Sequence, residues 1–168
     1  MTPRCGRSPL VFLVACLGVS TIAVASQYPL DQAAAIISRP DAKKLHRAGI
    51  RTTLDILNRG RTVVGRQRLA DLTGLRVDQI EAWTALSDLL RVRGIGPDVA
   101  RLLTAVNIRT ISDLQKADAT AIAQAIQVVN RERHLSTNPP GAEPLGYWIG
   151  LSRGLPIVLE WSSPVEAH

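Results

Sequence analysis

The stretch "GIGP" at residues 94–97 has the residue types and spacing that could hold a ligand. Glycine adopts left-handed backbone conformations at little cost, and Pro97 suits the first turn of a helix. We expect Ile95 to point into the core, with both Gly94 and Gly96 in left-handed geometry. The free amides of the two glycines and the start of the helix would then form a cluster of donors for one phosphate.

Some charged residues near this hairpin favour phosphate binding and others oppose it. Arg93 and Arg101 would add positive charge around a phosphate, whereas Asp98 stands where phosphate-binding hairpins often carry a basic residue. One hairpin would neutralise about two or three phosphates, so binding to nucleic acid would be weak, independent of sequence and sensitive to salt. The alternative is that the two glycines form only a tight turn between helices.

Catalytic and metal chemistry is not predicted. The three histidines, at positions 46, 134 and 168, are scattered, and both cysteines fall in the first 16 residues, which excludes a zinc site of the usual spacing. The sequence also has no nucleophile elbow, P-loop or paired-carboxylate motif. We therefore expect a binding module, with no enzymatic activity, cofactor, metal or small-molecule substrate.

Residues 1–25 have the pattern of an export signal. Two arginines precede an uncharged apolar run at residues 10–25, and Ala23 and Ala25 supply the small residues of a cleavage site. The run is shorter than the roughly 20 residues that span a bilayer. We predict a cleaved signal peptide and an exported protein, periplasmic or extracellular. An uncleaved segment would instead anchor the chain to the membrane, and a true start further downstream would leave the protein cytoplasmic.

Composition favours a helical globular domain. The 168 residues are 46% hydrophobic and 20% charged, and the low aromatic content of 4% favours helices over strands. Loss of the signal would remove two arginines and both cysteines, which lowers the formal net charge from +6 to +4 and leaves no disulfide. This mild basic excess permits contact with nucleic acid or anionic lipid without requiring either.

Helix patterns with clear ends position the hairpin. Thr52 with Asp55 predicts a capping box, Gly74 predicts a helix stop, and Trp83 falls on a buried helical stripe. No alternating strand pattern of any length appears, so we predict an all-α fold, a compact bundle of short helices. The expected helical segments are 28–38, 40–50, 52–57, 62–74, 77–90, the segment after Pro97, 118–135 and 145–155.

An internal repeat organises these helices. "AGIRTTLDIL" at 48–57 aligns with "VNIRTISDLQ" at 106–115, an offset of 58 residues, and each copy reads as a helix, a short turn and a Thr-capped helix. The bundle is thus predicted to consist of two helix-hairpin-helix-like repeats. At the same offset the hairpin at 94–97 falls on residues 36–39, where glycine is absent, so the first copy lacks it.

Five motifs occur in order over about 115 residues, from about Pro40 to Pro156. They are L-x-x-A-G-I-x-T-x-x-D-I-L from Leu45, G-R-x-x-L-A-x-x-T-G from Gly65, I-x-x-W from Ile80, R-x-R-G-I-G from Arg91 and W-I…L-P from Trp148. In these motifs and in their order, the chain resembles a bacterial family of tandem helix-hairpin-helix proteins known only as a domain of unknown function. The resemblance implies a helical fold and a nucleic-acid or protein partner, and it implies no catalytic chemistry.

Two binding functions follow from these observations. We favour an exported scaffold for an unidentified protein partner, because the first hairpin is missing and Asp98 opposes a phosphate. Weak binding of nucleic-acid backbone through the second hairpin is the alternative. The expected organisation is a signal peptide at 1–25, a tandem helix-hairpin-helix-like domain at 27–134, a linker at 135–144, a C-terminal helix packed on the domain at 145–155 and a frayed tail at 156–168.

Overall fold

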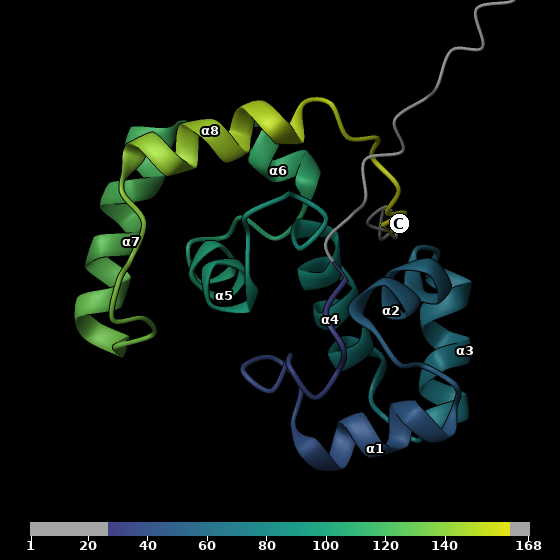
Figure 1. Ribbon diagram of the computed structural model, residues 1–168. Helices are drawn as coiled ribbons and strands as arrows, with labels where there is room; N and C mark the ends of the chain where they lie inside the picture. The colour runs from purple at the N-terminus through teal and green to yellow at the C-terminus, as the bar shows by residue number, and fades with distance from the viewer. Residues whose placement is uncertain (1–26, 162–168) are drawn as a thin grey trace, which may run out of the picture.

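The computed structural model describes residues 27–161 of the protein (Figure 1), so the expected signal peptide and both cysteines lie outside the described residues. Within this range the protein is all-α, as predicted, with a single isolated backbone bridge between Pro29 and Thr52. The helices are α1 (Arg39–Arg47), α2 (Thr53–Gly60), α3 (Val63–Thr73), α4 (Val77–Leu89), α5 (Pro97–Ala105), α6 (Ile111–Lys116), α7 (Ala119–Arg133) and α8 (Ala142–Ser152).

Local sequence signals set most helix ends. The Asp55 amide donates a hydrogen bond to the Thr52 hydroxyl at 3.1 Å, and the Thr52 amide donates one to the Asp55 carboxylate at 2.9 Å. These two bonds confirm the predicted capping box at α2. Thr110 and Asp113 form the same box at α6. Gly74 ends α3 with a left-handed φ of 63°, as predicted.

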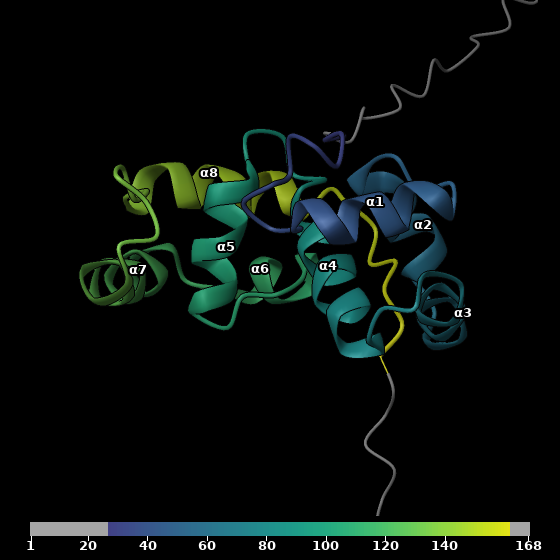
Figure 2. The same cartoon turned by 90° about the horizontal axis from the view of Figure 1, so that it is seen from below.

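Two apolar clusters form the core, and α4 contributes to both. Its first half, with Ile80 and Trp83, packs with α1, α2 and α3. Its second half, with Leu86 and Leu89, packs with α5 to α8, as does Leu90, the residue that follows the helix. The side chain of Trp83 is only 7% exposed, which confirms its prediction as a core residue. In Figure 2, α4 lies between the group of α1 to α3 and the group of α5 to α8.

Close helix contacts fix α2 beside α3 and α4. A β-carbon on Gly60 would overlap the Thr84 side chain of α4, and one on Gly65 would overlap the Arg59 carbonyl of α2. Glycine at both positions therefore allows the three helices to approach closely. In the short connection between α2 and α3, Arg61 is exposed, and the half-buried Thr62 caps α3.

The segment at 28–38 differs from its prediction. It consists of turns rather than a helix, because its backbone pairs with a distant segment: the Leu30 amide donates to the Arg51 carbonyl at 3.0 Å and the Thr53 amide donates to the Tyr28 carbonyl at 2.9 Å. The first true helix begins at Arg39, with Ser38 as its N-cap and Pro40 in its first turn.

The C-terminal part also differs from its prediction. The last helix spans Ala142–Ser152 rather than 145–155, and it packs against α7 and α6. Residues 156–161, which we name the C-terminal strap, are ordered against the domain rather than frayed. The Glu160 amide donates to the Arg61 carbonyl at 2.8 Å and Leu159 is buried. Figure 2 shows this yellow segment returning between α4 and the α2–α3 pair.

The strap closes over a buried arginine. Arg66 of α3 is 1% exposed, and its guanidinium donates to the Gly60 carbonyl at 3.0 Å and to the Glu160 carbonyl at 2.8 Å. Its Nε lies 3.3 Å from a carboxylate oxygen of Glu81, and its guanidinium carbon lies 5.5 Å from the centre of the Trp161 ring. The predicted tail is thus part of the folded domain as far as Trp161.

Candidate functional site

The hairpin between α4 and α5 has one left-handed glycine. Gly94 has φ +96°, whereas Gly96 has φ −94° in extended backbone. The prediction that both glycines are left-handed is therefore wrong for Gly96, because that residue is the N-cap of α5 and an N-cap needs extended geometry. Ile95 is fully buried, as expected, and its amide donates to the Val92 carbonyl at 3.0 Å.

Two aromatic side chains lie against this hairpin. A β-carbon on Gly94 would be 2.8 Å from Nε1 of Trp148, and the Tyr28 hydroxyl lies 3.5 Å from the Ile95 carbonyl oxygen. Among the described residues, the amides of Gly94 and Gly96 donate to no acceptor. The hairpin thus keeps free donors, but Trp148 partly covers the approach to Gly94.

The arginines near the hairpin differ in exposure and in the partners that they contact. Arg93 is exposed and Arg101 is half-buried in the second turn of α5. Arg91 is already engaged, because its guanidinium lies 2.7 Å from the Asp88 carboxylate and 3.1 Å from the Pro156 carbonyl. Asp98 is exposed in the first turn of α5 and adds negative charge there. The positive charge available to a phosphate is therefore small.

The position equivalent to the hairpin in the first half of the chain offers no anion site. Ser38 caps α1, and its hydroxyl accepts the Asp41 amide at 3.3 Å and donates to the Asp41 carboxylate at 2.7 Å. The hydroxyl that caps α1 is thus used within the helix, and the Asp41 carboxylate adds negative charge at its start.

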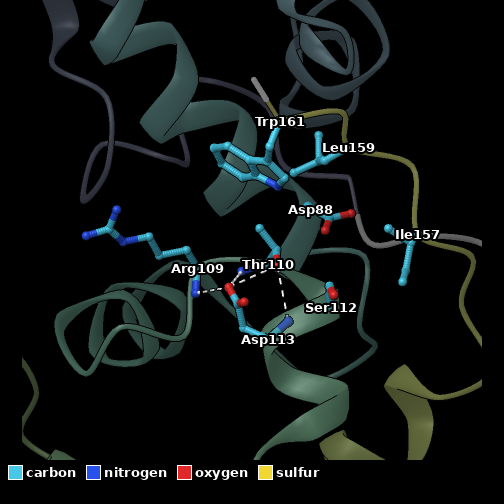
Figure 3. A pocket seen from close by; sticks show the side chains of 8 residues that line it. All are labelled: Asp88, Arg109, Thr110, Ser112, Asp113, Ile157, Leu159 and Trp161. Atoms are coloured by element: carbon cyan, nitrogen blue, oxygen red, sulfur yellow. Dashed lines mark hydrogen bonds between the residues drawn. The ribbon is translucent and has the colours of Figure 1, made fainter. Parts of the chain in front are cut away.

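A cavity of about 360 Å³ lies between the start of α6 and the C-terminal strap (Figure 3). The carboxylates in this cavity already accept hydrogen bonds from the backbone. The Arg109 and Thr110 amides donate to Asp113, both at 3.0 Å, and the Ile111 amide donates to Asp88 at 2.9 Å. Figure 3 shows the Arg109 guanidinium pointing away from Asp113. These groups hold α6 in place, and the sequence did not reveal the cavity because the strap was expected to be frayed.

A surface groove of about 390 Å³ runs beside α3. It lies between the end of α2 and one face of α3, and its lining residues are Asn58, Arg59, Arg61, Thr62, Gly65, Arg68, Leu69 and Leu72. On the adjoining outer face of the helix, Val64 and Leu72 are 59% and 69% exposed. Sequence reasoning missed this surface, although Val64, Arg68 and Leu72 recur at the four-residue spacing of one helical face.

Metal and membrane sites are not evident in the described part of the chain. No group of three metal-binding side chains gathers among residues 27–161, and none of the helices there is long and apolar enough to cross a membrane.

Comparison with known proteins identifies a family for the chain. A family model described as "Domain of unknown function (DUF4332)" matches residues 36–155, which includes all the helices from α1 to α8. No curated protein and no solved structure matches the chain.

Proposed function

The chain belongs to the DUF4332 family, and we propose that it is a non-catalytic binding module whose partner is another protein. The outer face of α3 carries this proposal. Val64 and Leu72 are the most exposed large apolar side chains of that helix, and they flank the exposed Arg68. Apolar residues gathered on an exposed face are typical of protein interaction sites.

Cross-linking tests this function directly. A photoreactive amino acid placed at Val64 is expected to form an adduct with another protein in cells that produce the chain. The same group placed at Val128 of α7, which is 47% exposed, serves as the control. Adducts at Val64 that disappear when Leu72 is changed to Ser would support the proposal. Equal labelling at the two positions, or none at Val64, would contradict it.

We also infer that the domain is built from two helix-hairpin-helix-like units, α1–α2 and α5–α6. In support, α1 and α5 are both nine residues long, begin 58 residues apart and precede helices with identical Thr-Asp capping boxes. The turn before each capping box contains a left-handed residue, Gly49 with φ 76° and Asn107 with φ 64°. Gly94 and Gly96 occur in the second unit alone.

Weak binding of nucleic-acid backbone remains the second candidate, because the Gly94 and Gly96 amides are free and Arg93 is exposed. A duplex of any sequence should then be retarded at about 50 mM salt and released by about 200 mM. Arg93→Ala with Arg101→Ala should flatten the salt slope by about one to two. If no duplex is retarded at low salt, the hairpin does not bind nucleic acid and is only a turn between helices.

We further propose that residues 1–25 direct export and are then removed. The expected mature chain starts at Ser26 or Gln27 and lies outside the cytoplasm. Fractionation with N-terminal sequencing checks both points. Full-length protein in the cytosol, with Cys5 still open to alkylation, would contradict export.

A further inference from the structure

We propose that the groove beside α3 binds an acidic amphipathic segment of the partner protein, an inference that rests on the protein-binding function proposed above. The groove has a shape suited to a short segment. Its lining extends along α3 from Thr62 to Leu72, a distance of about 15 Å at the rise of an α-helix. That length matches about three turns of a bound helix or a shorter extended peptide.

Gly65 lines the groove where α2 and α3 pack closely together. A β-carbon there would overlap the Arg59 carbonyl, so the position cannot carry a larger side chain while α2 and α3 keep their packing. Leu69, one turn further along, also lines the groove but is only 1% exposed, so the apolar surface open to a partner comes from Leu72. The hollow is therefore fixed by the contact between the two helices, and the binding surface exists before a partner arrives.

The rim of the groove is positively charged. Arg59, Arg61 and Arg68 are all exposed, and no acidic residue lines the groove. Arg59 donates to the Ala48 carbonyl at 3.1 Å and is held in place, whereas Arg61 and Arg68 form no ion pair with any described residue. Two free guanidiniums at the edge of a hollow favour carboxylates on the occupant.

Apolar contacts distinguish a polypeptide from a nucleic acid as the occupant. The side chain of Leu72, which lines the groove and is 69% exposed, offers apolar contact area that a phosphate backbone cannot use, since its outer surface is charged. A segment with leucine-like side chains on one face and carboxylates beside them would contact both Leu72 and the arginines of the rim. Helix-in-groove recognition uses this spacing of apolar anchors along one face.

Three matched synthetic peptides test the inference on the purified protein. Each has leucine at three- and four-residue spacing over 14 residues, and the flanking positions are all Glu, all Gln or all Lys. Fluorescence anisotropy of the labelled peptides should give at least about tenfold tighter binding for the Glu peptide than for the Gln peptide. The Lys peptide should bind more weakly than either, because the arginines repel it.

Variants of the protein test whether the peptides bind in the groove beside α3. Arg61→Gln with Arg68→Gln should remove most of the preference for Glu, because only Arg59 remains at the rim, and Leu72→Ser should weaken the Glu and Gln peptides alike by about three- to tenfold. Arg131→Gln with Arg133→Gln removes the same charge from exposed positions of α7 and should change nothing. Circular dichroism of each variant should match the wild type, since the substituted side chains are exposed.

Several outcomes would overturn the inference. Equal affinity for the Glu and Gln peptides would refute the acidic partner, yet a loss on Leu72→Ser and adducts at Val64 would leave the protein-binding function standing. Competition by duplex DNA that depends on Arg61 and Arg68 would assign the groove to nucleic acid. Binding that is unaffected by all the α3 variants would place the peptide elsewhere, and a lack of Val64 adducts would refute the protein-binding function itself.

Discussion

At the scale of single residues, Arg66 shows how a charged side chain can serve a fold. Its guanidinium joins three separate parts of the chain: the end of α2 at the Gly60 carbonyl, α4 at Glu81 and the strap at the Glu160 carbonyl. A buried guanidinium is tolerated when its donors have partners, and here two of the partners are carbonyls that would otherwise be unpaired.

Arg66→Ala should lower the free energy of unfolding by about 2–4 kcal/mol, because it leaves a cavity and removes the donors to the Gly60 and Glu160 carbonyls. Arg68→Ala, on the exposed side of the same helix, should change it by less than about 0.5 kcal/mol. Urea unfolding of the two variants measures the difference. Similar losses for both would mean that Arg66 contributes no more than a surface arginine.

The two glycines of the hairpin should respond differently to the same substitution. Gly94→Ala places a β-carbon at φ +96° and against Trp148, so a loss of about 1–3 kcal/mol is expected. Gly96→Ala should cost less than about 1 kcal/mol, because Gly96 has φ −94° and its nearest neighbour, the Tyr28 hydroxyl, is 3.8 Å away. Thermal unfolding followed by circular dichroism compares them. A larger loss at Gly96 would contradict the observed turn geometry.

At the scale of elements, the α2 capping box links helix stability to pH. Burial raises the pKa of Asp55, but hydrogen bonds from the Arg51 and Thr52 amides, the Thr52 hydroxyl and the Arg59 charge outweigh it, so the pKa lies below its usual value. Because the folded-state pKa is lower than the unfolded one, the carboxylate stabilises the fold above about pH 4. That contribution disappears as the pH falls through the folded-state pKa.

Asp55→Asn should therefore reduce the dependence of stability on pH. The wild type should lose stability between about pH 5 and pH 2 more steeply than the variant, and the gap between them should be largest near neutral pH and close as the solution is acidified. Urea unfolding at several pH values provides the curves. Parallel curves would show that the Asp55 carboxylate contributes no pH-dependent stability.

The C-terminal strap is expected to behave as part of the domain. Leu159→Ala should cost about 2–3 kcal/mol, because the side chain is buried. Ile157→Ala, in the same strap but 60% exposed, is the control and should cost less than about 0.5 kcal/mol. Hydrogen exchange should also show protection of the Glu160 amide, which donates to the Arg61 carbonyl. Rapid exchange at Glu160 would mean that the strap detaches readily.

Elements were predictable where their cause was local. The capping box at Thr52 and the stop at Gly74 depend on residues within one turn, and both were read from the sequence. The turns at 28–38 and the strap depend on backbone bonds to residues tens of positions away, for which the sequence carries no periodic signal. Their apolar or proline-containing patterns therefore suggested a helix and a frayed tail.

The candidate sites also depend partly on local sequence and partly on tertiary contacts. The glycine spacing at 94–96 located the hairpin, but the conformation of Gly96 depends on its role as the cap of α5. The groove depends on how closely α2 approaches α3 at Gly65, which is a tertiary contact. Its one sequence signal was the spacing of Val64, Arg68 and Leu72, which is also compatible with an ordinary buried face.

At the scale of the whole molecule, α4 decides whether the two halves unfold together. Its buried residues belong to both apolar clusters, and the strap adds a second connection from α8 back to α3 through Arg66. Two clusters that share a helix and a strap should form one cooperative unit. The alternative is that α1 to α3 unfold first and leave α5 to α8 folded.

Trp83→Ala tests this cooperativity. The side chain lies in the cluster of α1 to α3, and its truncation should lower the free energy of unfolding by about 3–5 kcal/mol. In the variant, fluorescence reports from Trp148 beside the hairpin and Trp161 in the strap, whereas circular dichroism reports from all the helices. If the halves are coupled, both signals should shift to the same lower urea midpoint in a single transition. A helical signal that falls in two steps, with the fluorescence change divided between them, would show that the damage stays in the first half and that α4 does not transmit it.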